Sequence, residues 1–207
     1  TTSQQNIIMG SDAGIAQTTN GQSIIIGHEA AQLYAAGQGV IMGYHAGQFA
    51  TGTNTMAIGY RAGYRFIGNY NTAIGNYAAG SYASSGTGSN NLFVGPYVGY
   101  NIDTGNRNVI LGSGDNSTSA GRQLTTGNDN TIVGYCAGKN IQTANDNTLV
   151  GSNAGASLTT GAGNILLGAS SGFNLNNGSY NIIFGESAGF NQTNSDYNIH
   201  IGYQAGY

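Results

Sequence analysis

Short, largely apolar runs alternate along the chain with longer polar, glycine-rich segments. An apolar triplet followed by Gly recurs with its Gly at positions 10, 27, 43, 59, 75, 95, 112, 134, 151, 168, 185 and 202. Nine of the eleven steps between these glycines are 16 or 17 residues long, and the other two are 20 and 22 residues. Self-similarity at a fixed short period predicts a repeat architecture of twelve similar units.

Each unit is numbered below from its Gly, so that slot −1 precedes this Gly and slot +1 follows it. Slot −4 is Asn in nine of the twelve units, slot +3 is Ala in nine and slot +4 is Gly in nine. The short apolar runs are rich in Ile and Val and end at Gly, which favours strands over helices. A unit has room for about two strands and two turns, and it buries a hydrophobic face only by stacking on its neighbours.

The expected fold is therefore all-β, a β-solenoid or parallel β-roll of about twelve 16–17-residue coils. Residues 1–207 form a single repeat domain, with insertions near residues 80–90 and 113–128. At the usual strand spacing the rod has a length on the order of 55 Å.

Three slots have a structural interpretation. Gly at two fixed slots suits turns with positive φ, and Ala at slot +3 indicates a cramped interior. Stacked coils would turn slot −4 into a ladder of side-chain amides. Its predicted members are Asn71, Asn91, Asn108, Asn130, Asn147, Asn164, Asn181 and Asn198.

Both faces of the predicted strand are apolar. Slots −1 and −3 point to one side of a strand and slot −2 points to the other, yet all three are apolar in most units. A strand that is apolar on both faces is covered on both faces. One face can line the interior of the coil, and the other needs a partner, most simply identical chains around an axis. The pattern thus predicts an obligate homo-oligomer.

Composition agrees with a neutral, extended fold. The chain has 36 Gly, one Pro and only 6% charged residues, whereas about a quarter is usual. Its net charge of −3 offers no basic patch, so nucleic acid is not an expected partner. We expect no membrane insertion by this segment, because no apolar run reaches about 18 residues.

The segment 71–78 (NTAIGNYA) resembles the head repeats of YadA-type trimeric autotransporter adhesins. The segment 201–207 (IGYQAGY), with Asn198 before it, is also similar to repeats of phage tail fibres and of surface glycoproteins of large algal viruses. The resemblance implies a homotrimeric fibre or head segment that is extracellular, on a virion or a cell surface. The period is longer than that of the adhesin repeats, and neither a heptad stalk nor an anchor is present. Because the chain ends within the motif, we expect it to be part of a longer fibre.

Ionisable residues are few and scattered over different slots, which predicts no catalytic site and no cofactor. Asp115 and Arg122 fall in the disrupted seventh unit and are interpreted as surface charges. His28 and His45 occupy slots +1 and +2 of adjacent units and could lie close together. Without a third ligand they predict no metal site.

His200 is the one polar residue at slot −2. If this slot faced a three-fold axis, three imidazoles would meet there and could hold an ion. The alternative, which we favour, is that the last unit is an atypical capping unit.

The aromatic residues are the candidate binding surface. The chain has 14 Tyr and no Trp, and many of its rings fall at slots +1 and +5, where stacking would align them in columns. Such columns can staple turn to turn, or they can present flat rings and phenolic hydroxyls to a glycan. The glycan-binding candidates are Tyr44, Tyr60, Tyr135, Tyr203, Tyr64, Tyr100, Phe173, Phe190 and Tyr207.

The expected function is that of a non-enzymatic structural or adhesive fibre segment that attaches to a host cell-surface glycan or receptor. One alternative is an ice-binding solenoid, but such a fold needs a regular Thr face, and slot −3 is Thr only at Thr72, Thr131 and Thr148. The other alternative is a glycan-cleaving tailspike, which needs paired carboxylates in a groove.

Overall fold

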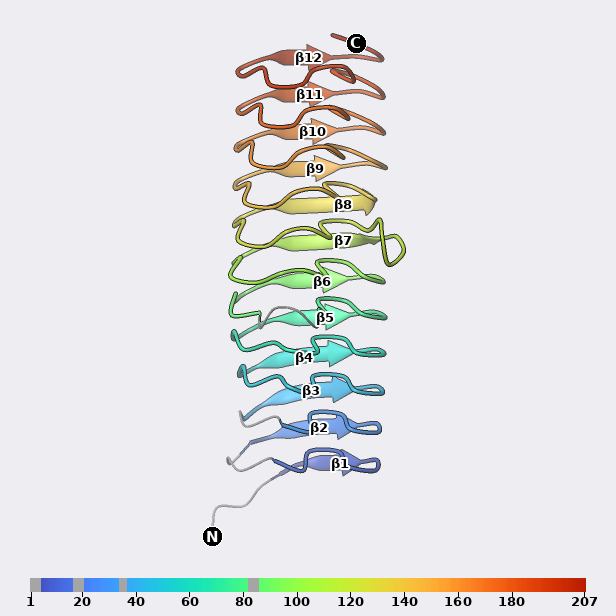
Figure 1. Ribbon diagram of the computed structural model, residues 1–207, viewed down its shortest axis with the longest axis vertical. Helices are drawn as coiled ribbons and strands as arrows, with labels where there is room; N and C mark the ends of the chain where they lie inside the picture. Colours follow the sequence, from blue (N-terminus) through green and yellow to red (C-terminus); the bar gives the residue numbers. More distant parts are fainter. Residues whose placement is uncertain (1–4, 17–20, 34–36, 82–85) are drawn as a thin grey trace.

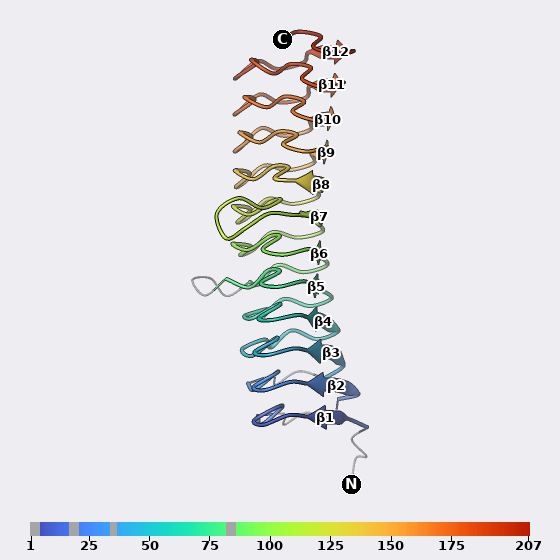
Figure 2. The same ribbon diagram turned by 90° about the vertical axis from the view of Figure 1, so that its right-hand side faces the viewer.

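The computed structural model describes residues 5–16, 21–33, 37–81 and 86–207 as one straight rod. The chain winds from one end of the rod to the other, with all strands stacked along one side (Figures 1 and 2). The strands are β1 (Ile7–Met9), β2 (Ser23–Ile26), β3 (Gly39–Met42), β4 (Thr55–Ile58), β5 (Thr72–Ile74), β6 (Leu92–Val94), β7 (Val109–Ser113), β8 (Thr131–Tyr135), β9 (Thr148–Val150), β10 (Ile165–Leu167), β11 (Ile182–Phe184) and β12 (Ile199–Ile201).

The twelve strands form a single parallel sheet in sequence order, and the described residues contain no helix. Equivalent slots are paired throughout: Leu149 at slot −2 lies opposite Leu166, for example, and Gly112 opposite Gly134. The register therefore confirms the repeat alignment across both insertions. The chain is a β-solenoid of about eleven complete turns, as the periodicity predicts.

Each turn contains one strand, not the two strands expected from its length. Slots +2, +4 and −5 adopt left-handed φ values, as at Asn153 (+55°), Gly155 (+58°) and Asp146 (+58°). Residues in this region cannot continue an extended strand. Backbone hydrogen bonds still join the turns there, including Ser170 N–H to the Ser152 carbonyl at 2.8 Å. The remainder of each turn consists of corners, the bends made by these left-handed residues. Each corner stacks on the equivalent corner of the neighbouring turn.

Steric crowding between neighbouring turns explains why each unit has Gly at its reference position. Gly151 has a φ of +138°, and a Cβ atom on it would lie 2.4 Å from the carbonyl oxygen of Gly168 in the next turn. The same close approach recurs along the column, from Gly10 to Gly185. Any larger residue would push the turns apart, so the column requires glycine.

Three columns of side chains fill the interior. The first is slot −2, where Ile25, Ile110 and Leu166 are fully buried. The second is the Ala column at slot +3, which confirms the predicted cramped interior. The third is slot +7, which the sequence interpretation missed because its apolar residues stand alone in polar turns. Its large buried members are Phe66, Ile102, Ile141, Leu158 and Leu175.

The predicted asparagine ladder is confirmed. The Nδ2 group of Asn164 donates to Oδ1 of Asn147 at 3.0 Å and to the carbonyl of Gly178 at 2.9 Å. Oδ1 of Asn147 also accepts the backbone N–H of Asn164 at 2.9 Å. The same pattern links all eight predicted residues in an unbroken row from Asn71 to Asn198. The ladder therefore pairs polar groups at the start of the strands from β5 to β12.

The insertion after β7 leaves its turn at the corner that follows the strand. After β7, residues 114–119 form a loop that projects from the rod (Figures 1 and 2). Ala120 and Gly121 then take the places of slots +3 and +4, and Ala120 is fully buried. The insertion near residues 80–90 is described only in part, since residues 82–85 lie outside the described ranges.

Candidate functional site

The outward face of the sheet is apolar along the whole rod. Slot −2 is buried inside the turns, so slots −3 and −1 face away from the interior. Slot −1 is apolar in all twelve strands, with Met9, Ile26, Met42, Ile58, Ile74, Val94, Leu111, Val133, Val150, Leu167, Phe184 and Ile201. Several of these side chains are strongly exposed, including Phe184 at 54% and Ile201 at 66%. Two parallel rows of exposed and half-buried side chains result, apolar throughout at slot −1 and interrupted at slot −3 by Thr72, Thr131 and Thr148.

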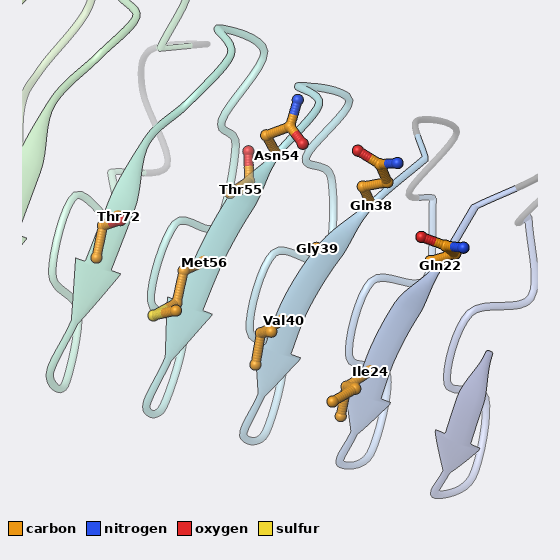
Figure 3. Close-up of a pocket in the computed structure, with 9 residues that line it drawn as sticks. All are labelled: Gln22, Ile24, Gln38, Gly39, Val40, Asn54, Thr55, Met56 and Thr72. Atoms are coloured by element: carbon orange, nitrogen blue, oxygen red, sulfur yellow. The ribbon is translucent and has the colours of Figure 1, made fainter. Parts of the chain in front are cut away.

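A shallow hollow of about 360 Å³ opens on this face. Figure 3 shows Ile24, Val40, Met56 and Thr72 in a row across β2 to β5, with amide side chains near the beginnings of the strands. Gly39 and Thr55, both at slot −4, also line the hollow. The hollow is a widening of the apolar face rather than an enclosed ligand pocket.

His200 lies in the interior column, not on this outward face. It pairs in register with Ile183, which is fully buried inside the preceding turn. A Cβ atom on Gly206 would lie 2.4 Å from its imidazole, so the last corner folds over the ring. An ion site shared by three His200 rings would need each ring to point outward, toward the neighbouring chains. The position agrees with the capping interpretation.

A column of rings follows the corner after each strand over five successive turns. It begins with His28 and continues through Tyr44, Tyr60, Tyr77 and Tyr97. Successive ring centroids lie 5.1, 5.3, 5.2 and 5.0 Å apart. We call these five residues the tyrosine column. Tyr44 and Tyr60 are 44% and 39% exposed, so part of each of these two stacked side chains reaches solvent.

Arg61 is the charge embedded in this column. Its guanidinium lies 5.2 Å from the ring centroid of Tyr60 and 5.9 Å from that of Tyr77, and Nη1 donates to the Tyr77 hydroxyl at 3.3 Å. Cation–π contacts of this kind hold the guanidinium against the rings. Burial, chiefly, raises the pKa of Tyr77 above its usual value. The column is therefore a packed surface, not a set of independent side chains.

The structure divides the nine sequence-predicted aromatic candidates into groups. Tyr44 and Tyr60 belong to the tyrosine column, and Tyr100 borders it, 6.0 Å from Tyr97. Phe173, Phe190 and Tyr207 form a second stack with centroid spacings of 5.0 and 5.4 Å.

The remaining candidates are isolated or buried. Tyr135 and Tyr203 are 53% and 71% exposed, but the neighbouring units place Ser113, Ser152 and Glu186 at the same slot. Tyr64 is only 8% exposed and packs edge-on against Phe49. It offers no ring face to a ligand.

Two sets of tyrosines escaped the sequence interpretation. Tyr77 and Tyr97 fall at slot +2 but join rings at slot +1, since the left-handed corner brings these slots together. Tyr180 and Tyr197 fall at slot −5, before the strand, and stack at 5.3 Å while 56% and 76% exposed. Their constant spacing from the repeat Gly was the signal that could have identified them.

At the first end of the tyrosine column, Glu29 joins the two histidines. One ligand atom from each of His28, Glu29 and His45 lies within 4.8 Å of the others. Nε2 of His45 is 2.9 Å from Oε2 of Glu29. Burial, the largest effect, lowers the pKa of His45 despite the opposing influence of Glu29, and Arg61 and His28 lower it further. Sequence reasoning found the two histidines but missed Glu29, which supplies a third donor.

Asp115 and Arg122 do not form a pair. Oδ1 of Asp115 accepts hydrogen bonds from the backbone and hydroxyl groups of Ser117 and Thr118. Arg122 instead donates through Nε to the carbonyl of Asn116 at 3.0 Å. The bonds from Ser117 and Thr118 hold the pKa of the Asp115 carboxyl well below its usual value. Both charges therefore stabilise the projecting loop.

Within the residues that the structure describes, no helix has the length and apolar character needed to cross a lipid bilayer. Comparison with protein-family models, curated proteins and solved structures found no match.

Proposed function

We propose that this chain is a non-enzymatic segment of an extracellular fibre that assembles as a homotrimer and attaches to host-surface glycan. The observation that carries the proposal is the pair of apolar rows on the outward face of the sheet, from Ile7 and Met9 in β1 to Ile199 and Ile201 in β12. The rod and the rows share one axis, so identical chains can meet along their full length.

The uncovered rows support self-association for a physical reason. Contiguous exposed apolar surface with a polar border is typical of protein–protein interfaces. Polar side chains border the rows here, with Gln22 and Asn54 before the strands and Glu186 after one of them. Chains packed side by side around a closed axis bury each face and leave the corners outside. The number three comes from the resemblance to trimeric adhesin heads and phage fibres.

Light scattering of the purified chain tests the oligomer. The expected mass is three times the 21.1 kDa chain mass. A stable monomer would contradict both the buried interface and the trimer. Twice the chain mass would retain the interface and contradict the three-fold arrangement.

The tyrosine column supports the adhesive part of the proposal. In a trimer closed through the sheet faces, we expect the column to stay outside, because its residues follow the strands at slots +1 and +2. Exposed rings bearing hydroxyl groups are suited to ligands with one apolar and one polar side, such as sugar rings. The net charge of −3 over 207 residues also favours a neutral ligand over a charged one.

A glycan array with matched variants tests this surface. Tyr60→Ser removes a ring from the column, and it is structurally mild because Ser152 occupies the same slot in another turn. We expect roughly tenfold weaker glycan binding. Tyr135→Ser is the control, since Tyr135 holds the same slot outside the column. Equal losses in both variants, or no glycan bound by the wild type, would contradict the assignment.

A further inference from the structure

We propose that His28, Glu29 and His45 bind a divalent transition-metal ion of the Zn²⁺ type, which joins the second and third turns of the solenoid. This is a separate binding site that presupposes neither the trimer nor glycan binding, although His28 also belongs to the tyrosine column. Among the described residues, His28, Glu29 and His45 form a group of metal-ligating side chains whose donor atoms lie close enough to share one ion.

The donor set fits the chemistry of such an ion. Imidazole nitrogen and carboxylate oxygen are ordinary Zn²⁺ ligands, and two His with one Glu leave the fourth tetrahedral position to water. The three donor atoms lie within 4.8 Å of one another, and bound ligands at about 2 Å from a central ion fall inside this range. His28 is exposed, so an ion can enter from solvent and keep its water ligand.

His45 has the surroundings of a ligand. Its side chain is 13% exposed, and neither ring nitrogen has an aligned hydrogen-bond partner in the described structure, although Nε2 is in ionic contact with Glu29. A buried polar atom without a partner is energetically costly and calls for an explanation. A metal ion would coordinate one of these nitrogens and remove part of that cost.

The surrounding side chains hold the donors in place. Gln48 donates from Nε2 to Oε2 of Glu29 at 2.6 Å and to Oε1 of Gln32 at 2.8 Å, which orients the carboxylate. The ring of Tyr44 lies 4.0 Å from that of His45 and 5.1 Å from that of His28, nearly parallel to both. Supporting contacts of this kind are typical of metal sites, where they fix the orientation of the ligands.

The nearby charges are compatible with a cation. Glu29 supplies a negative charge within the donor set. Arg61 is a positive group at the equivalent corner of the next turn. Its guanidinium is drawn toward the rings of Tyr60, Tyr64 and Tyr77 at 5.2, 5.8 and 5.9 Å. The aromatic contacts hold the guanidinium against these rings.

The repeat provides matched variants, because other turns show which residues each slot accepts. His28→Ser reproduces Ser11 at slot +1. Glu29→Gln reproduces Gln204, and His45→Asn reproduces Asn153, both at slot +2 with left-handed φ values of +52° and +55°. Circular dichroism of each variant should match the wild type, so that a loss of binding reports the ligand.

Isothermal titration of the full chain with ZnCl₂ provides the test. We expect one saturable site per chain, with affinity reduced roughly tenfold or more in each of the three variants. His200→Ile is the control: it removes a histidine from the interior column and should leave binding unchanged. Wild-type protein that binds no Zn²⁺ at millimolar concentration would overturn the proposal. So would binding that survives in His28→Ser, Glu29→Gln and His45→Asn alike.

A second readout does not depend on the variants. Co²⁺ bound by two imidazoles and a carboxylate gives visible absorption bands of a tetrahedral ion, and Zn²⁺ should displace them at a ratio of one per chain. Zn²⁺ should also raise the melting temperature of the wild type, because a ligand that binds only the folded state stabilises it. Octahedral Co²⁺ spectra with no change in melting temperature would contradict the site.

Discussion

At the scale of single residues, each slot of the repeat answers one physical requirement. Asn147 shows this for slot −4: its Nδ2 donates to Asn130, Asn145 and Gly161, and its Oδ1 accepts two bonds from Asn164. No other side chain of this size carries both an NH₂ group with two donors and a carbonyl oxygen that accepts. The slot is therefore chemically specific and was recognisable from the sequence.

Asn147→Leu should be strongly destabilising. Leu has a similar size, but it leaves several buried polar groups of the two neighbouring turns without partners, at about 1–3 kcal/mol each. We expect the free energy of unfolding to fall by about 4 kcal/mol, measured by urea denaturation. Asn116→Ala, in the exposed loop after β7, is the control and should change it by less than about 0.5 kcal/mol. Comparable effects would mean that the ladder adds little.

Gly151→Ala tests the glycine column. The new Cβ atom would lie 2.4 Å from the carbonyl oxygen of Gly168, at a φ of +138°. We expect a loss of about 3 kcal/mol in thermal or urea unfolding, because the backbone of two turns must separate. Gly86→Ala adds the same methyl group 3.4 Å from a ring carbon of Phe66, which is ordinary contact, and should be nearly neutral. A neutral Gly151→Ala would show that the turns can slide apart freely.

At the scale of elements, the unit is one short strand followed by a corner built from left-handed residues. The strands contain only three to five residues and depend on their neighbours for hydrogen bonds. The corner tolerates insertion, as after β7, where Ala120 re-enters the interior column after the projecting loop. The loop itself is organised by Asp115, whose carboxylate accepts bonds from Ser117 and Thr118.

The loop after β7 should respond to pH through Asp115. The folded loop lowers the pKa of this carboxyl below its usual 3.8, so its stabilisation is complete above pH 3.8 and is lost progressively as the pH falls further. At pH 7, Asp115→Ala should speed hydrogen–deuterium exchange of residues 113–122, and the difference from wild type should shrink at pH 2. Asp115→Asn keeps an acceptor oxygen but carries no charge, so at pH 7 its exchange should be faster than that of the wild type and slower than that of Asp115→Ala. Equal protection in Asp115→Ala would contradict this role.

At the scale of the whole molecule, the rod has two different sides. The sheet side carries the apolar rows, and the corner side carries the tyrosine column and the His28–Glu29–His45 group. The proposed trimer uses the first side, which leaves the second for ligands. Assembly and binding are thus assigned to separate surfaces of the same turn.

Ile165→Asp tests the sheet face as an interface. Ile165 is 41% exposed in the single chain, so a charge there costs the isolated solenoid little. In the trimer it would be buried without a partner, and we expect light scattering to give the monomer mass of 21.1 kDa with an unchanged circular dichroism spectrum. Ser152→Asp, on an exposed corner, should leave the oligomer intact. An Ile165→Asp protein of unchanged mass would place the interface elsewhere.

The sequence by itself determined the period, the strand that precedes each repeat Gly and the asparagine ladder, because each depends on spacing along a chain that repeats. It predicted a second strand in each turn, which the left-handed residues of the corners exclude. The sequence left open which strand face lies inside. Side chains alternate between the two faces, and this alternation does not say which face is turned toward the interior. The tertiary structure decided this: the corner after each Gly turns toward slot −2, so His200 points inward and Ile165 outward. It also decided that Glu29 meets His28 and His45, because left-handed corners stacked in register bring together side chains that spacing alone does not align.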